Sequence, residues 1–267
     1  MEVNNKIISY SLYGNNQRYT VPLLENSKIA LNLYSGWTIY VYHDHTVNKS
    51  FLDRLRQNGV VTINIEQTNH GNLPPKMWRF LPVKNLSIDC VIFRDADSLL
   101  TQREQDLVMK WMKSDKSVHI IRDHPLHVAP ILAGMFGIKH NSFKILSKLM
   151  DEKRPNIKQR PIDYDQVFLA DYLYPRIIKM ALIHVSFFKY WNEQAIKIEP
   201  VSDGYNYIGS VEIGDELKSE EEKNILLKSK FMNGIPYSFG KLMRYRVRPT
   251  IYFSKFQNFV FNLFQSE

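Results

Sequence analysis

The sequence contains a single cysteine and no long apolar run. One thiol cannot form an internal disulfide, which excludes a disulfide-stabilised secreted scaffold and favours a reducing compartment. No stretch approaches the roughly 18 apolar residues of a membrane-spanning helix, and we expect no signal peptide at the N-terminus. Cys90 lies inside an apolar run and is expected to be a buried structural thiol. These absences favour a cytoplasmic protein.

Acidic residues are missing from the stretch between Lys223 and Ser266, which carries eight basic residues. The formal net charge is +8, and the remaining 27 Lys and Arg residues equal the 27 Asp and Glu residues of the whole chain. Aromatic and apolar residues between Tyr252 and Leu263 recur at helical spacing. The tail is predicted to be a helix that packs on the domain or covers a ligand site of it, or an interfacial helix in peripheral contact with the anionic inner face of a membrane.

The chain has 267 residues, of which 44% are hydrophobic, enough for one α/β domain with a sizeable core. Strands and helices alternate through its first third, as in a mostly parallel sheet covered by helices on both faces. Ligands of such sheets bind beyond the carboxyl ends of the strands. We predict an α/β domain at residues 1–214 and a basic, aromatic helical extension at residues 215–267.

The periodicity and the turn residues predict the following elements. Strands are expected at residues 6–12, 37–42, 60–65, 88–93, 118–121, 134–138 and 177–185. Helices are expected with Pro22 near the first turn and an end at Gly36, from a capping box at Ser50, from a capping box at Thr101, from Asn141 to about Met150, and from Asp163 to Pro175.

Two aspartates follow the apolar strand at residues 88–93, in the sequence Phe93-Arg94-Asp95-Ala96-Asp97-Ser98. Side chains at positions i and i+2 of an extended segment point the same way, so Asp95 and Asp97 can converge on one ion. Carboxylates are hard ligands that suit Mn²⁺ or Mg²⁺, and such a cation can bridge the protein to a diphosphate. Asp163 and Asp165 form a second Asp-x-Asp pair, but they precede a helix and could cap it instead.

Several segments together resemble bacterial and viral polysaccharide glycosyltransferases of the GT-A fold, such as those that build capsule or lipopolysaccharide. More distantly the chain is similar to the retaining glycogenin and galactosyltransferase family. The segments are Trp78-Arg79-Phe80-Leu81-Pro82, the Asp95 motif, Arg103-Glu104, Trp111, residues 119–125 and Gly134-Met135-Phe136-Gly137. The resemblance covers residues 6–212 and implies a Rossmann-like sheet. It implies transfer of a hexose from a nucleotide-sugar donor to a glycan or lipid-linked acceptor in polysaccharide biosynthesis.

The resemblance also implies roles for particular residues. His184 would join the two aspartates on the metal, which favours Mn²⁺, although it could equally be a core histidine. Asp165 and Gln166 would lie near the reacting sugar carbon of a retaining enzyme, the outcome slightly favoured, whereas Asp163 or Asp165 would be the base of an inverting one. The candidate nucleotide and donor-binding residues are Ser9, Tyr10, Tyr13, Asp44, Arg79, Arg94, Asp123 and Gly134. Arg79 could instead be a surface helix residue, and Asp123 a turn cap or a partner of Arg122.

Two other functions use some of the same features. A nucleotidyltransferase acting on sugar phosphates also needs two carboxylates and a cation, but residues 13–16 are a poor version of its phosphate-binding loop. A non-enzymatic protein could bind nucleic acid or a membrane through the basic tail. The charge-neutral body makes a nucleic-acid partner the weaker of these interpretations.

Overall fold

The computed structural model describes residues 5–153, 164–211, 216–229 and 231–235. Its main sheet has eight strands in the order β3-β2-β1-β4-β6-β5-β7-β9. Only the two pairings of β6, with β4 and with β5, are antiparallel within this sheet of the described chain. The strands are β1 (Lys6–Leu12), β2 (Trp37–His43), β3 (Val61–Asn64), β4 (Cys90–Arg94), β5 (Val118–Arg122), β6 (Met135–Lys139), β7 (Ala181–Val185) and β9 (Ala195–Lys197). The predicted α/β class, with a mostly parallel sheet, is confirmed.

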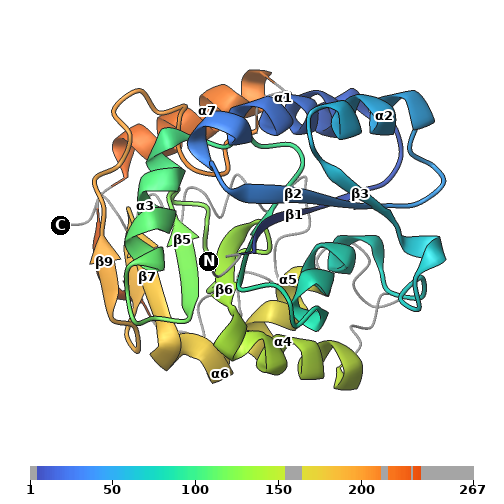
Figure 1. Ribbon diagram of the computed structural model, residues 1–267. Helices are drawn as coiled ribbons and strands as arrows, with labels where there is room; N and C mark the ends of the chain where they lie inside the picture. Colours follow the sequence, from blue (N-terminus) through green and yellow to red (C-terminus); the bar gives the residue numbers. More distant parts are fainter. Residues whose placement is uncertain (1–4, 154–163, 212–215, 230, 236–267) are drawn as a thin grey trace.

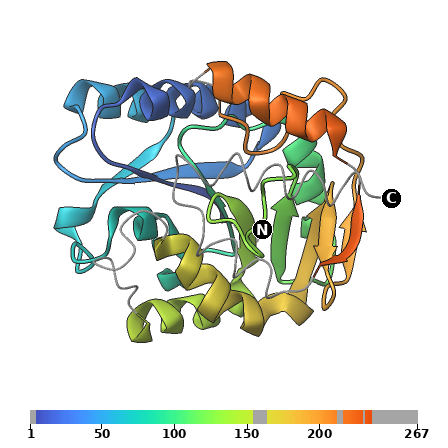
Figure 2. The same cartoon turned by 180° about the vertical axis from the view of Figure 1, so that it is seen from behind.

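Helices cover both faces of the sheet, with α1 and α2 on one face and α4, α5 and α6 on the other (Figure 1, Figure 2). The α-helices are α1 (Gln17–Leu33), α2 (Lys49–Gln57), α3 (Gln102–Met112), α4 (His140–Glu152), α5 (Tyr164–Phe168), α6 (Tyr174–Ile177) and α7 (Glu216–Lys228). Shorter or tighter helical segments are η1 (Ile65–Gln67), η2 (Pro75–Lys84), the π-helical η3 (Leu169–Leu173) and η4 (Ile178–Met180).

Each face of the sheet has its own apolar core, because residues of one strand alternate between the two faces. On β1, Ile8 and Tyr10 join the cluster under α1, α2 and α3, whereas Ile7 joins the larger cluster under η2 and α4. All five residues of β4 are buried. A strand buried on both faces positions the segment that follows it firmly, so the exit of β4 is a rigid place for a site.

Four local predictions differ from the structure. The first helix starts at Gln17, so Pro22 lies inside it, and Asn48 rather than Ser50 caps α2. The helical segment that begins at Tyr164 passes Pro175 and ends at Met180, so strand β7 starts at Ala181 instead of residue 177. A π-helical turn precedes Pro175 and shifts the hydrogen-bond pattern there, which accommodates a residue without an N–H group. The 3₁₀ segment η2 has no counterpart among the predictions.

The described part of the predicted extension packs on the domain. Leu226 of α7 joins the apolar cluster of Phe187, Phe188, Tyr190 and Tyr207. Strand β10 (Met232–Ile235) pairs in parallel with β8 (Phe188–Tyr190). The predicted tail helix around residues 252–263 lies outside the described residues. Among the helices that the structure describes, none combines the length and the apolar character needed to cross a bilayer.

Candidate functional site

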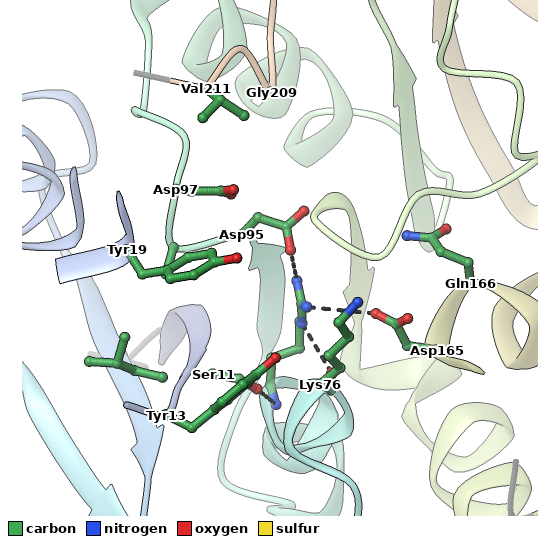
Figure 3. Close-up of a pocket in the computed structure, with 13 residues that line it drawn as sticks. Ser11, Tyr13, Tyr19, Lys76, Asp95, Asp97, Asp165, Gln166, Gly209 and Val211 are labelled. Carbon is green, nitrogen blue, oxygen red and sulfur yellow. Dashed lines mark hydrogen bonds and ion pairs between the residues drawn. The ribbon is translucent and has the colours of Figure 1, made fainter. Parts of the chain in front are cut away.

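A cavity of about 340 Å³ lies beyond the carboxyl ends of β1 and β4. Figure 3 shows Asp95 and Asp97 on one side of it, the rings of Tyr13 and Tyr19 on another, and Asp165 and Gln166 across from them. The lining residues are Ser11, Leu12, Tyr13, Tyr19, Lys76, Arg79, Asp95, Ala96, Asp97, Asp165, Gln166, Gly209 and Val211. The predicted strand exit therefore opens on a cavity with charged walls.

Asp95 and Asp97 both face this cavity, as their spacing predicts. The side chain of Asp95 is 48% exposed and forms an ion pair with Arg79. The side chain of Asp97 is 14% exposed and accepts hydrogen bonds from Arg18, at 3.1 Å from Nε and 3.0 Å from Nη2. Burial raises the pKa of Asp97, and the charge of Asp95 raises it further. Each carboxylate is thus balanced by one arginine.

Arg79 lines the cavity between Asp95 and Asp165, and four contacts hold its guanidinium in place. Its Nη1 contacts Asp95 and the backbone carbonyl of Arg94 at 3.3 Å, its Nε donates to the carbonyl of Lys76 at 3.2 Å, and its Nη2 is 3.7 Å from Oδ2 of Asp165. Only 5% of the residue is exposed. The predicted donor-binding arginine is therefore a wall of the cavity, carried by η2 and held between two carboxylates.

Strand β1 anchors the backbone of Arg79 through two serines. The hydroxyl of Ser9 donates to the Arg79 carbonyl at 2.7 Å, and the hydroxyl of Ser11 accepts from the Arg79 N–H at 2.8 Å. Ser9 is fully buried, so this predicted nucleotide-pocket residue supports η2 instead of lining the cavity. Ser11, two residues later on the same face of the strand, is the one that lines it.

Asp165 and Gln166 reach the cavity from α5. Asp165 is 2% exposed, and its Oδ1 has no hydrogen-bond partner among the described residues. Burial raises the pKa of this carboxyl, while Arg79 opposes the rise. The Gln166 amide lies between the Ile131 carbonyl and the Ala133 N–H, and with its N and O assigned to satisfy both, N donates to Ile131 at 3.1 Å and O accepts from Ala133 at 2.9 Å. Gln166 thus ties α5 to the loop before β6. Asp163 lies outside the described residues.

Gly134 lies directly against Asp95. A Cβ atom at this glycine would be 2.0 Å from Oδ2 and 2.5 Å from Cγ of Asp95. Any side chain at position 134 would therefore push the carboxylate out of its present place. Gly134, predicted to bind the donor, packs closely behind Asp95 in this structure.

Two predicted nucleotide-pocket residues point away from the cavity. Tyr10 is fully buried in the core under α1, because it occupies the opposite face of β1 from Ser9 and Ser11. Arg94 is 3% exposed and forms a buried ion pair with Glu104 of α3. The capping box predicted at Thr101 is half realised: the Thr101 hydroxyl accepts from the Glu104 N–H at 3.1 Å, while the Glu104 carboxylate binds Arg94.

Asp44 and Asp123 do not line the cavity either. Asp44 caps the turn after β2, where its Oδ1 accepts from the Thr46 N–H at 3.0 Å. The Thr46 hydroxyl in turn accepts from the Gly14 N–H at 2.7 Å, so Asp44 supports the loop after β1 indirectly. Asp123 is fully buried and pairs with Arg103 through hydrogen bonds of 2.8 and 2.7 Å, in place of the predicted turn cap or Arg122 partner.

The structure does not bring His184 to the two aspartates. His184 is 1% exposed, and its Nδ1 lies 2.8 Å from Nε2 of His119 on the neighbouring strand β5. The His119 ring stacks on Trp111 of α3. Burial lowers the pKa of His184 to about 4. Strands β6 and β5 separate β7 from β4, which amounts to about 14 Å at the usual strand spacing. The alternative of a hydrogen-bonded core histidine describes this residue, and we remove it from the proposed metal ligands.

The residues present suit a divalent cation with two protein ligands. No group of three or more His, Cys, Asp and Glu side chains in the described residues could hold an ion. Asp95 and Asp97 supply two hard carboxylates on one wall of a cavity with room beside them. Mg²⁺ and Mn²⁺ commonly bind through one or two carboxylates and fill their other positions with water and phosphate oxygens. The pair therefore fits a cation that is completed by a phosphate ligand.

Sequence reasoning missed four polar residues at the site: Ser11, Arg18, Tyr19 and Lys76. Arg18 and Tyr19 lie in the first turn of α1, directly after the exit of β1, and this position could have identified them. Lys76 comes three residues before Arg79 on η2, and its side chain extends into the cavity (Figure 3). The prediction of η2 as a helix would have placed both residues on one face.

The chain matches no model of a known protein family and no curated protein. Among solved structures, a glycosyltransferase involved in the glycosylation of the major capsid of PBCV-1 is 14% identical, with a TM-score of 0.42, over 68% of this chain and 82% of its own. A putative glucose-1-phosphate thymidylyltransferase from Bacillus anthracis is 12% identical, with a TM-score of 0.45, over 68% and 86%. A 4-diphosphocytidyl-2C-methyl-D-erythritol synthase from Anaerococcus prevotii is 8% identical, with a TM-score of 0.45, over 84% and 96%. At these identities the reaction has to be inferred from the residues of the cavity.

Proposed function

We propose that the protein is a metal-dependent glycosyltransferase of the GT-A type, which transfers a sugar from a nucleotide-sugar donor to a hydroxyl group of a glycan or lipid-linked acceptor. The observation that carries this proposal is the convergence of Asp95, Asp97, Arg79, Lys76 and Asp165 on one cavity at a strand exit. Carboxylates for a cation and basic groups for phosphate oxygens are the parts that a sugar diphosphate requires.

The charges of the site balance when a cation and a diphosphate bind together. Asp95, Asp97 and Asp165 supply three carboxylates, and three basic residues, Arg18, Lys76 and Arg79, lie on or next to the cavity. A divalent cation adds two positive charges, which match the two negative charges of a sugar diphosphate ester. When bound, Mn²⁺ or Mg²⁺ held by Asp95 and Asp97 would neutralise the negative charge that develops on the leaving diphosphate.

In the transfer, the bond between the sugar C1 and the diphosphate oxygen breaks, and its electron pair stays on that oxygen. The acceptor oxygen forms a new bond to C1 and gives its proton to an oxygen of the departing diphosphate in a retaining transfer, or to a carboxylate in an inverting one. Arg79, fixed between Asp95 and Asp165, is placed to bind phosphate or sugar oxygens. The partnerless Oδ1 of Asp165 can accept a hydrogen bond from a sugar hydroxyl.

Retention of configuration is the outcome we favour, since Asp165 and Gln166 resemble the Asp-Gln pair of the retaining enzymes. If the enzyme inverts instead, Asp165 would take the proton of the acceptor hydroxyl, and its raised pKa would suit that task. Proton NMR of the glycoside product distinguishes the two, because its new linkage keeps the anomeric configuration in which it was formed. The same anomeric configuration in donor and product supports retention, and the opposite configuration contradicts it.

A second candidate function is nucleotidyl transfer to a sugar phosphate, which would release pyrophosphate. Arg18, in the first turn of the helix that follows β1, favours it, because a basic group there suits a nucleoside triphosphate. Gly14 is the one glycine in the loop between β1 and α1, where a phosphate-binding loop would be richer in glycine. We therefore keep glycosyl transfer as the first proposal.

The products separate the two functions. The protein is incubated with Mn²⁺ and a panel of nucleotide sugars, and nucleoside diphosphate release is measured with and without a chelator. A parallel series supplies nucleoside triphosphates with sugar 1-phosphates and measures pyrophosphate. Glycosyl transfer predicts metal-dependent diphosphate release by the wild type and little by Asp97→Asn. Equal release by both proteins contradicts the proposal, and pyrophosphate release would establish the second function.

If the acceptor is lipid-linked, it lies in a membrane, and the proposal then includes contact between the protein and that membrane. Residues 236–267 contain five Lys and Arg residues, nine Phe and Tyr residues and one acidic residue. Co-sedimentation with vesicles that contain anionic lipid, for the full chain and a chain ending at Ile235, measures their contribution. Equal binding of the two proteins would contradict it.

A further inference from the structure

Each of the two aspartates of the proposed cation site forms an ion pair with an arginine, Asp95 with Arg79 and Asp97 with Arg18. The two arginines differ in burial and in the number of their contacts. Arg79 is 5% exposed and contacts Asp95, Asp165 and two backbone carbonyls. The Arg18 side chain is 39% exposed, and Asp97 is the one acceptor of its N–H groups among the described residues. Arg79 is therefore fixed in place, whereas Arg18 can leave its partner.

We infer that Arg18 is a diphosphate-binding residue that occupies Asp97 until a divalent cation arrives, and that it then transfers to the phosphate oxygens. This inference rests on the proposed function, because it assumes a cation on Asp95 and Asp97. It couples the two ligands, since the cation displaces Arg18 from Asp97 and the diphosphate gives Arg18 a new anionic partner. Binding of either ligand should therefore strengthen binding of the other.

The position of Arg18 permits this exchange without movement of the helix. Asn16 caps α1 by accepting from the Arg18 N–H at 2.9 Å, which fixes the backbone of the first turn. The guanidinium lies 5.8 Å from the ring centroid of Tyr19, which lines the cavity. Only the side chain has to rotate, and the neighbouring ring keeps it near the cavity.

The electrostatics supply the driving force in both directions. A guanidinium and a divalent cation cannot share one carboxylate oxygen without repulsion, so the cation must compete with Arg18 for Oδ2 of Asp97. A phosphate group bound to the same cation is the anion nearest to the displaced arginine. A guanidinium binds phosphate through paired N–H groups, and such charge-assisted hydrogen bonds are among the strong ones.

The variant Arg18→Ala tests the inference because it should change the two affinities in opposite directions. Mn²⁺ alone is titrated by electron paramagnetic resonance, and pyrophosphate as its manganese complex is titrated by calorimetry. Without Arg18, Mn²⁺ alone should bind about 3-fold tighter, because the partly exposed guanidinium no longer competes for Asp97. Pyrophosphate should bind about 10-fold weaker, because it loses a charged hydrogen-bonding partner.

Lys28→Ala is the matched control, since it removes one positive charge from the exposed side of the same helix, where Lys28 pairs with Glu25. It should leave both affinities unchanged. Arg18→Lys keeps the charge but not the paired N–H groups, and it should recover part of the pyrophosphate affinity.

Two results would overturn the inference while leaving the proposed function intact. One is an Arg18→Ala variant with wild-type affinity for both ligands, and the other is a variant that loses affinity for both, as expected of a damaged fold. A wild-type protein that binds neither Mn²⁺ nor the manganese complex of pyrophosphate would contradict the proposed function itself. The opposite signs, with an unchanged Lys28→Ala control, support the inference.

Discussion

Strands β4 and β5 each end in an arginine that is followed by an aspartate, in the pairs Arg94-Asp95 and Arg122-Asp123. Both arginines turn into the protein and form fully buried ion pairs, Arg94 with Glu104 and Arg122 with Glu193. The two strand exits are therefore built alike up to the aspartate.

The two aspartates then differ completely. Asp123 is fully buried and accepts from Arg103, from the hydroxyl of Ser186 and from the Ile208 N–H at 2.9 Å. The side chain of Asp95 is 48% exposed on the cavity, with Arg79 as its ionic partner. An Arg-Asp pair at a strand exit is thus structural where loops close over it, and available to a ligand where they leave it open.

The largest effect is expected at the closed exit, from Glu193→Gln. Both Glu193 oxygens bind Arg122, one at 2.9 Å, and the Tyr174 hydroxyl donates to Glu193 at 2.6 Å. Removal of the charge leaves a buried guanidinium without its counter-ion, which should cost about 3–5 kcal/mol of unfolding free energy. Urea denaturation measures the loss. Glu25→Gln, at an exposed pair, is the control, and a comparable effect of both variants would contradict the contrast.

The buried histidine pair on β5, the strand with the closed exit, and its neighbour β7 should also make stability depend on pH. His184 and His119 are buried against each other, and burial lowers the pKa of His184 to about 4 from an ordinary value of 6.5. The unfolded chain then takes up a proton at higher pH than the folded chain. The contribution of neutral His184 to the free energy of unfolding is complete above pH 6.5 and is lost as the pH falls toward 4, by at most about 3 kcal/mol.

Urea denaturation between pH 7.5 and pH 4 measures this loss. His184→Asn should remove the contribution of this residue to the loss of stability at low pH, so the variant's free energy of unfolding should change less with pH. A variant with the same pH profile as the wild type would exclude His184 as its source.

Asp123→Asn should lower stability by about 1–3 kcal/mol, because the buried carboxylate loses its charge toward Arg103. The activity of the remaining folded protein should persist, since Asp123 does not line the cavity. Thermal unfolding and nucleoside diphosphate release on the same sample report both properties. Loss of activity without loss of stability would mean that Asp123 contacts the donor after all.

The smallest effect is expected from Gly134→Ala, which acts on the open exit alone. The added Cβ atom would displace Oδ2 of Asp95, and Mn²⁺ affinity should fall by about 10-fold. Gly71→Ala is the matched control, because the nearest atom to its added Cβ is 3.7 Å away. If both variants bind Mn²⁺ like the wild type, Asp95 does not hold the ion.

The sequence identified the fold class and the cavity wall, because strand exits follow from apolar runs and their flanking residues. Asp95, Asp97 and Tyr13 line the cavity as residues that follow a strand, whereas Arg79, Asp165 and Gln166, which the resemblance implied, line it from η2 and α5. The prediction for Tyr10 was wrong because successive residues of a strand point to opposite faces of the sheet, and the sequence did not reveal which face of β1 meets the cavity. His184 failed because β6 inserts antiparallel between β4 and β5 and moves β7 away from the site. The prediction for Asp44 was wrong because this residue caps its own turn at Thr46, and the one for Asp123 because its partners Arg103, Ser186 and Ile208 come from distant segments.

The most direct test of the account is the binding of Mn²⁺ in the presence of pyrophosphate to the wild type, Asp97→Asn and Asp123→Asn, followed by electron paramagnetic resonance. The account predicts one bound ion in the wild type and in folded Asp123→Asn, and at least about 10-fold weaker binding in Asp97→Asn. Unchanged binding by Asp97→Asn would contradict it, since the open exit of β4 would then not be the metal site.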